Sequence, residues 1–173
     1  DRYRRQRQMC IRDRYSSQGK GLLLSSISDE SNSKVVVIGC GEVGKASIDK
    51  AIQIGASVVA IDLNKETLTE LKNKYEDKIT TIIGGSEEAK MAVRSADLVL
   101  GAVLLPGRKP PVVIMEEDID QMEKGTVIID VAIDQGGCVE NVKPNTHSEP
   151  FEIRNGVIVS AIANLPGAVP KTS

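Results

Sequence analysis

The sequence predicts an α/β fold in which a doubly wound, mostly parallel sheet forms a single domain. Three observations favour this class. Short runs of branched apolar residues alternate with amphipathic segments at the spacing of βαβ units. The apolar runs are nearly continuous, as expected of strands covered by helices on both faces. The chain has 173 residues, which is enough for one domain with a substantial core.

The regular part of the chain divides into strands and helices in sequence order. The predicted strands are the apolar runs 35–39, 57–62, 78–85, 96–103, 126–132 and 156–163. The predicted helices cover residues 42–54, 65–74, 86–94 and 115–122. Gly55 ends the first helix, and Ser86 caps the third. Residues 104–111 are predicted to be a loop because their prolines stop a helix.

The amino-terminal stretch does not share this pattern. Residues 1–18 contain six arginines and no apolar periodicity. A basic arm, a transit peptide and a translated cloning remnant are the competing interpretations, and the repeated DRY together with CIRDR favours the remnant. We expect a non-native or disordered tail at 1–18, a short helix and linker at 19–33, and the domain proper at 34–173. The termini suggest a fragment that is truncated at its carboxyl end.

Composition narrows the classes of function. A net charge of −2 gives no global basic field for nucleic acid. No apolar run reaches membrane-spanning length. Three widely spaced cysteines without a CxxC pair suggest free thiols in a reducing, cytoplasmic setting, and the acids are not spaced as metal ligands. We therefore expect no nucleic acid, no membrane and no metal.

A glycine-rich turn follows the first predicted strand. Gly39, Gly41 and Gly44 form G-x-G-x-x-G between a buried strand and a helix, which is the context of the dinucleotide fingerprint. The first glycine permits a tight turn, the second lets a pyrophosphate approach, and the third lets helix and strand pack closely. The helix amino terminus, with Glu42 and Val43 in its first turn, offers N–H groups to the phosphates.

An acid ends the second strand of the same unit. Asp62 is placed to accept hydrogen bonds from ribose hydroxyls and to repel a 2′-phosphate, so the expected cofactor is NAD. Together these residues predict a Rossmann-type NAD(H)-binding domain, against the alternative of a tight turn without a ligand. Nucleotide-sensing modules share the arrangement, so it does not indicate a reaction.

Residues 127–140, VIIDVAIDQGGCVE, form the second informative stretch. Asp134 follows a strand at the edge of the sheet where ligands bind in doubly wound folds, and it precedes two glycines. It is a candidate catalytic group, although a turn-forming aspartate before Gly-Gly explains it equally well. Asp130 lies within the strand and needs a partner if it is buried.

From residue 19 to residue 173 the sequence resembles the family shared by alanine dehydrogenase and the alpha subunit of nicotinamide nucleotide transhydrogenase. The matching motifs, in the family's order, are GKGLLL, VVVIGCGEVG, GASVVAIDLN, ADLVLGAVLLPGRKPP, DVAIDQGGC, THSEP and ANLPGAVPKTS. DVAIDQGGC and ANLPGAVP are specific to this group. Asp134 followed by Gln135 favours the dehydrogenase branch.

The resemblance implies oxidative deamination of L-alanine with NAD to pyruvate and ammonium. The α-hydrogen leaves as hydride, and the imine is then hydrolysed. Asp134 matches the family's catalytic aspartate, which assists proton transfer and water at the reacting carbon. Asp62 matches the ribose-binding acid, and Asn164 matches a residue near the nicotinamide and substrate. Positions that line the nicotinamide pocket are matched by Val103, Leu104, Val131 and Ile133.

The resemblance also implies parts that this sequence does not contain. The family takes a lysine and a histidine from a separate substrate domain, and His147 does not match that histidine. We therefore expect the chain alone to bind NAD(H) without oxidising alanine, and the parent enzyme to be a homo-hexamer. The alternatives are the NAD-binding domain of a transhydrogenase, which implies a membrane complex, and a non-catalytic NAD(H)-sensing module.

Overall fold

The computed structural model describes residues 20, 33–105 and 107–164. Three stretches lie outside these residues: the predicted tail at 1–18, the predicted helix and linker except Lys20 and Ser33, and the ANLPGAVPKTS motif after Asn164. The strands are β1 (Lys34–Ile38), β2 (Ser57–Asp62), β3 (Ile79–Ile83), β4 (Leu98–Gly101), β5 (Val127–Asp130), β6 (Glu152–Arg154) and β7 (Val157–Ser160). The helices are α2 (Glu42–Gln53), α3 (Lys65–Tyr75), α4 (Glu87–Arg94) and α5 (Glu116–Asp120), with short 3₁₀ turns η1 (Glu76–Lys78) and η2 (Ile133–Gln135).

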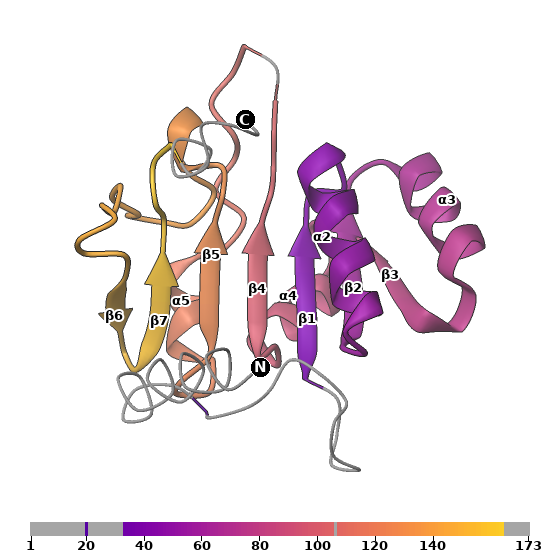
Figure 1. Ribbon diagram of the computed structural model, residues 1–173, viewed down its shortest axis with the longest axis horizontal. Coiled ribbons are helices and arrows are strands. Elements are labelled where there is room, and N and C mark those ends of the chain that lie inside the picture. Colours follow the sequence, from indigo (N-terminus) through magenta and orange to yellow (C-terminus); the bar gives the residue numbers. More distant parts are fainter. Residues whose placement is uncertain (1–19, 21–32, 106, 165–173) are drawn as a thin grey trace, which may run out of the picture.

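The strands form one seven-stranded sheet in the order β3-β2-β1-β4-β5-β7-β6. All neighbouring pairs are parallel except β6 and β7. The strand order reverses between β1 and β4, and their carboxyl ends lie together at the upper edge in Figure 1. Ligands bind at such a switch point in open α/β sheets. The predicted Rossmann-type, mostly parallel fold is confirmed.

Successive side chains of each strand point to opposite faces of the sheet, and they form an aliphatic core on each face. Val36 and Ile38 of β1 pack with α4 and α5 on one face of the sheet, whereas Val35 and Val37 pack with α2 and α3 on the other. In Figure 1, α2 lies in front of the sheet while α4 and α5 lie behind it. Side chains that alternate between two covered faces explain why the strands read as continuous apolar runs.

The strand β6 was not predicted from the sequence. It joins β7 through a two-residue turn at Asn155 and Gly156, whose φ angles are 51° and 88°. An Asn-Gly pair between short strands is a strong hairpin signal, because both residues tolerate a left-handed backbone. The prediction began the last strand at this glycine and so overlooked the hairpin.

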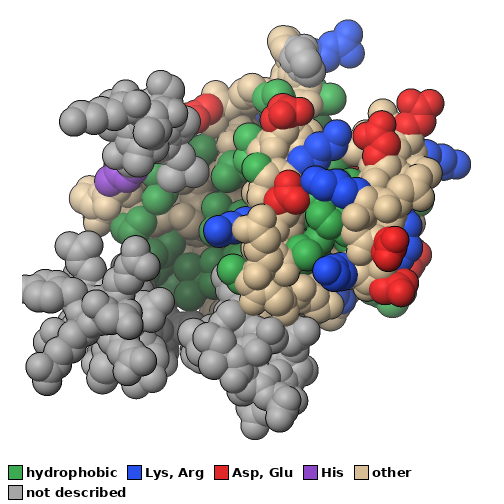
Figure 2. All heavy atoms as spheres, turned by 45° about the vertical axis from the view of Figure 1, so that its right-hand side comes forward, with side chains coloured by type: hydrophobic (Ala, Val, Ile, Leu, Met, Phe, Trp, Pro, Cys, Tyr) green, Lys and Arg blue, Asp and Glu red, His purple; other side chains and the backbone are tan. Residues whose placement is uncertain are grey.

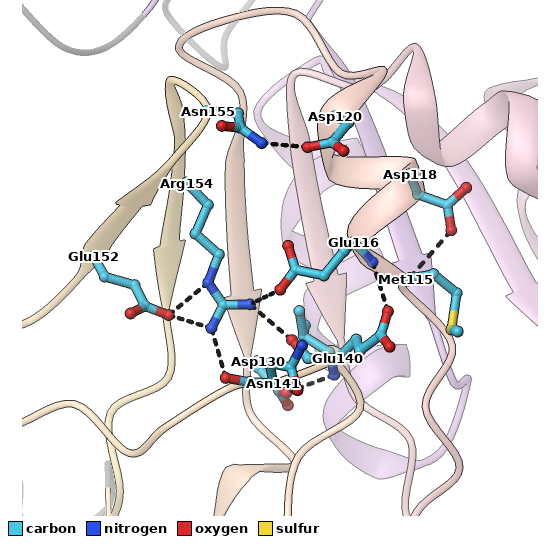
Figure 3. Close-up of polar contacts among 11 residues, drawn as sticks. Met115, Glu116, Asp118, Asp120, Asp130, Glu140, Asn141, Glu152, Arg154 and Asn155 are labelled. Atoms are coloured by element: carbon cyan, nitrogen blue, oxygen red, sulfur yellow. Dashed lines mark hydrogen bonds and ion pairs between the residues drawn. The ribbon is translucent and has the colours of Figure 1, made fainter.

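A polar network attaches β6 to the rest of the domain (Figure 3). The Arg154 guanidinium, with 14% of the side chain exposed, pairs with Glu116 at 2.9 Å and also with Glu152. It donates to the backbone carbonyls of Glu140 at 2.7 Å and Asn141 at 2.9 Å. One arginine therefore joins β6, the start of α5 and the segment that follows residues 131–138.

The helices of the first half are also joined to each other. The Tyr75 hydroxyl at the end of α3 donates to Asp49 of α2, and Lys74 Nζ lies 3.3 Å from the same carboxylate. Figure 2 shows charged side chains of both signs interspersed over this side of the molecule. The exposed surfaces of α2 and α3 thus carry mixed charges above an aliphatic core.

Candidate functional site

The three fingerprint glycines have different surroundings. Gly39 has φ +90°, and a Cβ atom there would lie 2.6 Å from the backbone oxygen of Ala102. A Cβ atom on Gly44 would lie only 2.0 Å from the oxygen of Gly39. Both positions therefore exclude any side chain. Gly41 differs because a Cβ atom there would meet nothing within 4 Å, so this glycine faces open space.

The amino terminus of α2 opens onto that space. Gly41 is its N-cap and supplies no side-chain hydrogen bond to the first turn. The N–H groups of the first turn of a helix have no intrahelical partner, and they carry the positive end of the helix dipole. Glu42 and Val43 are exposed in this turn. The geometry suits an anionic group that approaches the backbone.

Asp62 lies between two loops at the end of β2. One of its carboxylate oxygens accepts from the backbone N–H of Cys40 at 2.7 Å, and the other accepts from that of Asn64 at 2.8 Å. The side chain is partly exposed, and each oxygen keeps a lone pair for a further donor. The acid is therefore fixed beside the glycine-rich turn. Asn64 in turn caps α3 by accepting from Glu66 N at 2.8 Å.

Cys40, between the first two glycines, is a core residue. Its side chain is buried with the aliphatic cluster beneath α2, and its sulfur lies 3.7 Å from the oxygen of Ile61. Burial, together with the nearby charge of Asp62, raises the pKa of the Cys40 thiol to about 12. The thiol is therefore protonated at neutral pH and does not face the open space beside Gly41.

Asp134 and Asn164 meet although they are 30 residues apart. Asp134 is exposed in η2, and both of its carboxylate oxygens accept from the backbone N–H of Asn164, at 3.0 and 3.2 Å. Asn164 adopts a left-handed backbone with φ 51°. The structure thus brings the predicted catalytic acid and the predicted nicotinamide-side residue into direct contact.

The predicted pocket-lining residues follow neighbouring strands. The backbone N–H of Val131 donates to Gly101 at the end of β4 at 3.0 Å, which keeps the segments after β4 and β5 together. Val103 is partly buried against the core, and Leu104 is 61% exposed. Ile133 is buried. Their place around a nicotinamide stays a prediction.

One neighbour of the loop that carries Asp134 was missed by sequence reasoning. Gly136 has φ +109°, and a Cβ atom there would lie 2.9 Å from Cε of Lys109. The aliphatic part of Lys109 therefore lies across the η2 loop, and a side chain at position 136 would displace it. Lys109 belongs to the proline-rich loop, where no periodic pattern predicts its neighbours.

Within residues 20, 33–105 and 107–164, no three His, Cys, Asp or Glu side chains gather as a metal site would require. In the same part of the chain, no helix has the length and apolar character needed to cross a membrane.

Comparison with known proteins identifies the family. The family described as "Alanine dehydrogenase/PNT, C-terminal domain" matches residues 13–173. The chain belongs to this family. The predicted resemblance to the alanine dehydrogenase and transhydrogenase family is therefore confirmed. The match begins inside the stretch assigned to a non-native tail, and the boundaries at residues 19 and 34 stay predictions.

Individual members of the family agree with this assignment. The alanine dehydrogenase of Bacillus subtilis strain 168 is 46% identical over 156 residues, which are 90% of this chain and 41% of that protein. A solved L-alanine dehydrogenase has a TM-score of 0.85 at 39% identity, covering 91% of this chain and 44% of that chain. The chain thus spans less than half the length of these relatives.

A transhydrogenase shares the fold. The structure from Sinorhizobium meliloti has a TM-score of 0.72 at 23% identity, and the match covers 86% of this chain and 42% of that chain. At this identity the likeness extends to the fold alone.

Proposed function

We propose that this chain is the NAD(H)-binding domain of an alanine dehydrogenase, which oxidatively deaminates L-alanine to pyruvate and ammonium. The observation that carries the proposal is the contact between Asp134 and Asn164 at the edge of the sheet where ligands bind in this fold. A module that only senses NAD(H) needs no paired polar groups at the nicotinamide end. Similarity to alanine dehydrogenases over 90% of the chain supports the same reading.

The glycine-rich turn and β2 supply the dinucleotide half of the site. The open space at Gly41 and the free N–H groups of α2 suit a pyrophosphate. The Asp62 carboxylate is held at the same turn and is left with acceptor capacity for ribose hydroxyls. Its negative charge disfavours a 2′-phosphate, so NAD fits this site better than NADP. NAD held by these residues would supply the acceptor for the α-hydrogen of the amino acid, which leaves as hydride.

Asp134 supplies the acid–base part of the reaction. Loss of hydride from L-alanine leaves an imine, which water must attack at the same carbon. Asp134 is an exposed carboxylate oriented by the Asn164 N–H, so it is suited to accept a proton from that water. The carboxylate keeps lone pairs free after accepting one backbone N–H, which leaves it able to act as a base.

The rest of the proposed enzyme lies outside this chain. We infer that the substrate-reading residues, a lysine and a histidine, belong to the greater part of the relatives' length that this chain does not cover. The parent protein is then a cytoplasmic homo-hexamer, and the isolated chain binds NAD(H) without oxidising alanine.

The test is the Asp134→Asn variant of the full-length protein, assayed with L-alanine and NAD. We expect at least a hundredfold loss of kcat, because an amide cannot accept the proton, with NADH affinity changed less than threefold. NADH binding by the wild type without amino acid oxidation would contradict the proposal. In that case, hydride transfer to NADP would identify a transhydrogenase, and no transfer at all would identify a sensor.

A further inference from the structure

Asp130 is a completely buried acid at the end of β5, with an exposed fraction of 0%. Among the ion pairs of the described residues, none involves this carboxylate. Its Oδ2 accepts from the backbone N–H groups of Cys138 at 2.7 Å and Val139 at 3.2 Å. Its Oδ1 accepts from the N–H of Ala132 at 2.9 Å and lies 3.4 Å from the Cys138 sulfur. The carboxylate is therefore compensated by four donors rather than by a cation.

These donors come from the two ends of one loop. Ala132 directly precedes η2, and Cys138 and Val139 directly follow the two glycines after it. The loop has internal bonds as well, since Gln135 N and Gly137 N both donate to the oxygen of Ala132, at 2.9 and 3.1 Å. Asp130 thus closes the loop that carries Asp134.

Close packing fixes the loop in this position. Gly137 has φ +74°, and a Cβ atom there would lie 3.0 Å from Asp130 Oδ2 and 2.4 Å from Val142. On the other side, a Cβ atom on Gly101 would lie 2.3 Å from the Cys138 sulfur. The two glycines leave just enough room for the loop to reach the buried carboxylate, so a shift of the loop meets neighbouring atoms.

Hydrogen bonds connect Asp130 to the candidate site through this loop. The Asp134 carboxylate lies in its middle and binds the Asn164 N–H. Among the hydrogen bonds of the described part of the chain, none joins Asp130 directly to Asp134 or to Asn164. The hydrogen bonds that link the buried acid to the exposed one therefore pass through the loop backbone.

We propose that Asp130 is a positioning residue: its buried carboxylate gathers the N–H groups at both ends of the 131–138 loop and thereby sets where the Asp134 carboxylate lies. This rests on the proposed function for what Asp134 does. The placement of Asp134 is nevertheless measurable without turnover, through its contact with the Asn164 N–H.

The first experiment follows the Asn164 amide of the 173-residue chain by NMR. Asp134→Ala removes its acceptor and defines the resonance of the released amide. In Asp130→Asn the new NH₂ group faces N–H donors in either orientation, so the loop moves and the Asn164 resonance shifts toward its position in Asp134→Ala. Cys138→Ser keeps a donor at the same place, and its Asn164 resonance stays near that of the wild type.

Changes confined to residues 132, 138 and 139 in Asp130→Asn, with Asn164 unmoved, would overturn the proposal. If Asp130→Asn does not fold, the Cys138→Ala variant tests the positioning role instead. It removes only the thiol donor, and it must shift Asn164 part of the way in the same direction. An unchanged Asn164 resonance in folded Cys138→Ala would then count against positioning.

The second experiment measures kinetics in the full-length protein. Asp130→Asn is expected to lower kcat for amino acid oxidation at least tenfold while the KM for NAD stays within threefold. Cys138→Ser, which keeps the donor, is expected to retain most of the wild-type kcat. A purely structural role predicts a lower Tm with kcat per folded molecule unchanged, which would overturn the proposal. If the wild type oxidises no amino acid, the proposed function fails, while the NMR result still decides the role of Asp130.

Discussion

At the scale of single residues, the fingerprint glycines separate folding from binding. Gly44→Ala places a methyl group 2.0 Å from a backbone oxygen, so we expect a loss of roughly 3 kcal/mol or more in the free energy of unfolding. Gly41→Ala meets open space, so its loss of stability should stay near the roughly 1 kcal/mol that alanine costs at a helix N-cap. The methyl group would still obstruct a pyrophosphate, so NADH affinity should fall at least tenfold.

Urea unfolding and NADH titration of the two variants check this prediction. Each variant is the control for the other, because both add the same methyl group to the same motif. Equal stability losses in both variants, or unchanged NADH affinity in Gly41→Ala, would contradict the assignment of open space at Gly41 to a ligand.

The buried cysteines make a prediction about reactivity and pH. Burial and the charge of Asp130 raise the pKa of Cys138, and burial raises that of Cys40 to about 12, so both thiols stay neutral at pH 8. Cys10→Ser removes the third cysteine of the chain and leaves Cys40 and Cys138 as its thiols. In this background, native protein should react with a thiol reagent far more slowly than urea-unfolded protein. A raised thiol pKa disfavours the thiolate in the folded state, so stability falls as the pH rises above about 9 toward 12. Rapid native labelling would contradict this burial.

Some residues of the candidate site can be predicted from the sequence, whereas contacts that depend on loop conformation cannot. Side-chain chemistry and the surrounding motifs were enough to predict Asp62, Asp134 and Asn164 as site residues. The four donors to Asp130 could not be predicted, because three are backbone groups whose positions depend on the loop conformation. Lys109 was missed for a similar reason, since contact with Gly136 depends on how two irregular segments pack.

At the scale of elements, Arg154 holds β6 against α5 and the segment after residues 131–138. Arg154→Met removes charge-assisted hydrogen bonds to two acids and two carbonyls in a largely buried place, and should destabilise the domain by about 2 kcal/mol. Lys90→Met is the matched control, because the Lys90–Glu87 pair is exposed and contributes less than about 0.5 kcal/mol. Urea unfolding compares the two, and equal effects would contradict the role of Arg154.

Strands and helices with strong patterns were predicted close to their observed bounds, whereas short irregular elements were not. In the β1–α2–β2 unit, the continuous apolar runs predict the strands, Gly55 predicts the end of the helix, and Asp62 predicts the end of the second strand. All of these signals agree with one βαβ arrangement. The predicted strand 126–132 ends earlier, at Asp130, because that side chain takes the N–H of Ala132 and the chain turns into η2. Such a side-chain–backbone competition has no periodic signature.

At the scale of the whole molecule, the strand order accounts for the site. The glycine-rich turn follows β1, and the segment with Val103 follows β4. The Asp134 loop follows β5, so three segments far apart in sequence meet at one edge of the sheet (Figure 1). The alternation of strands and helices predicted this class of fold, because parallel strands joined by helices present all their carboxyl ends on the same side.

The central claim is that this edge is an NAD(H) site, and a titration of the chain with NADH and NADPH, followed by nicotinamide fluorescence, tests it most directly. The chain contains no tryptophan, which keeps the protein background low. We predict saturable NADH binding with at least tenfold weaker NADPH binding, because the Asp62 carboxylate repels a 2′-phosphate. Equal affinity for both nucleotides would contradict the role of Asp62, and binding of neither by the folded chain would contradict the site itself.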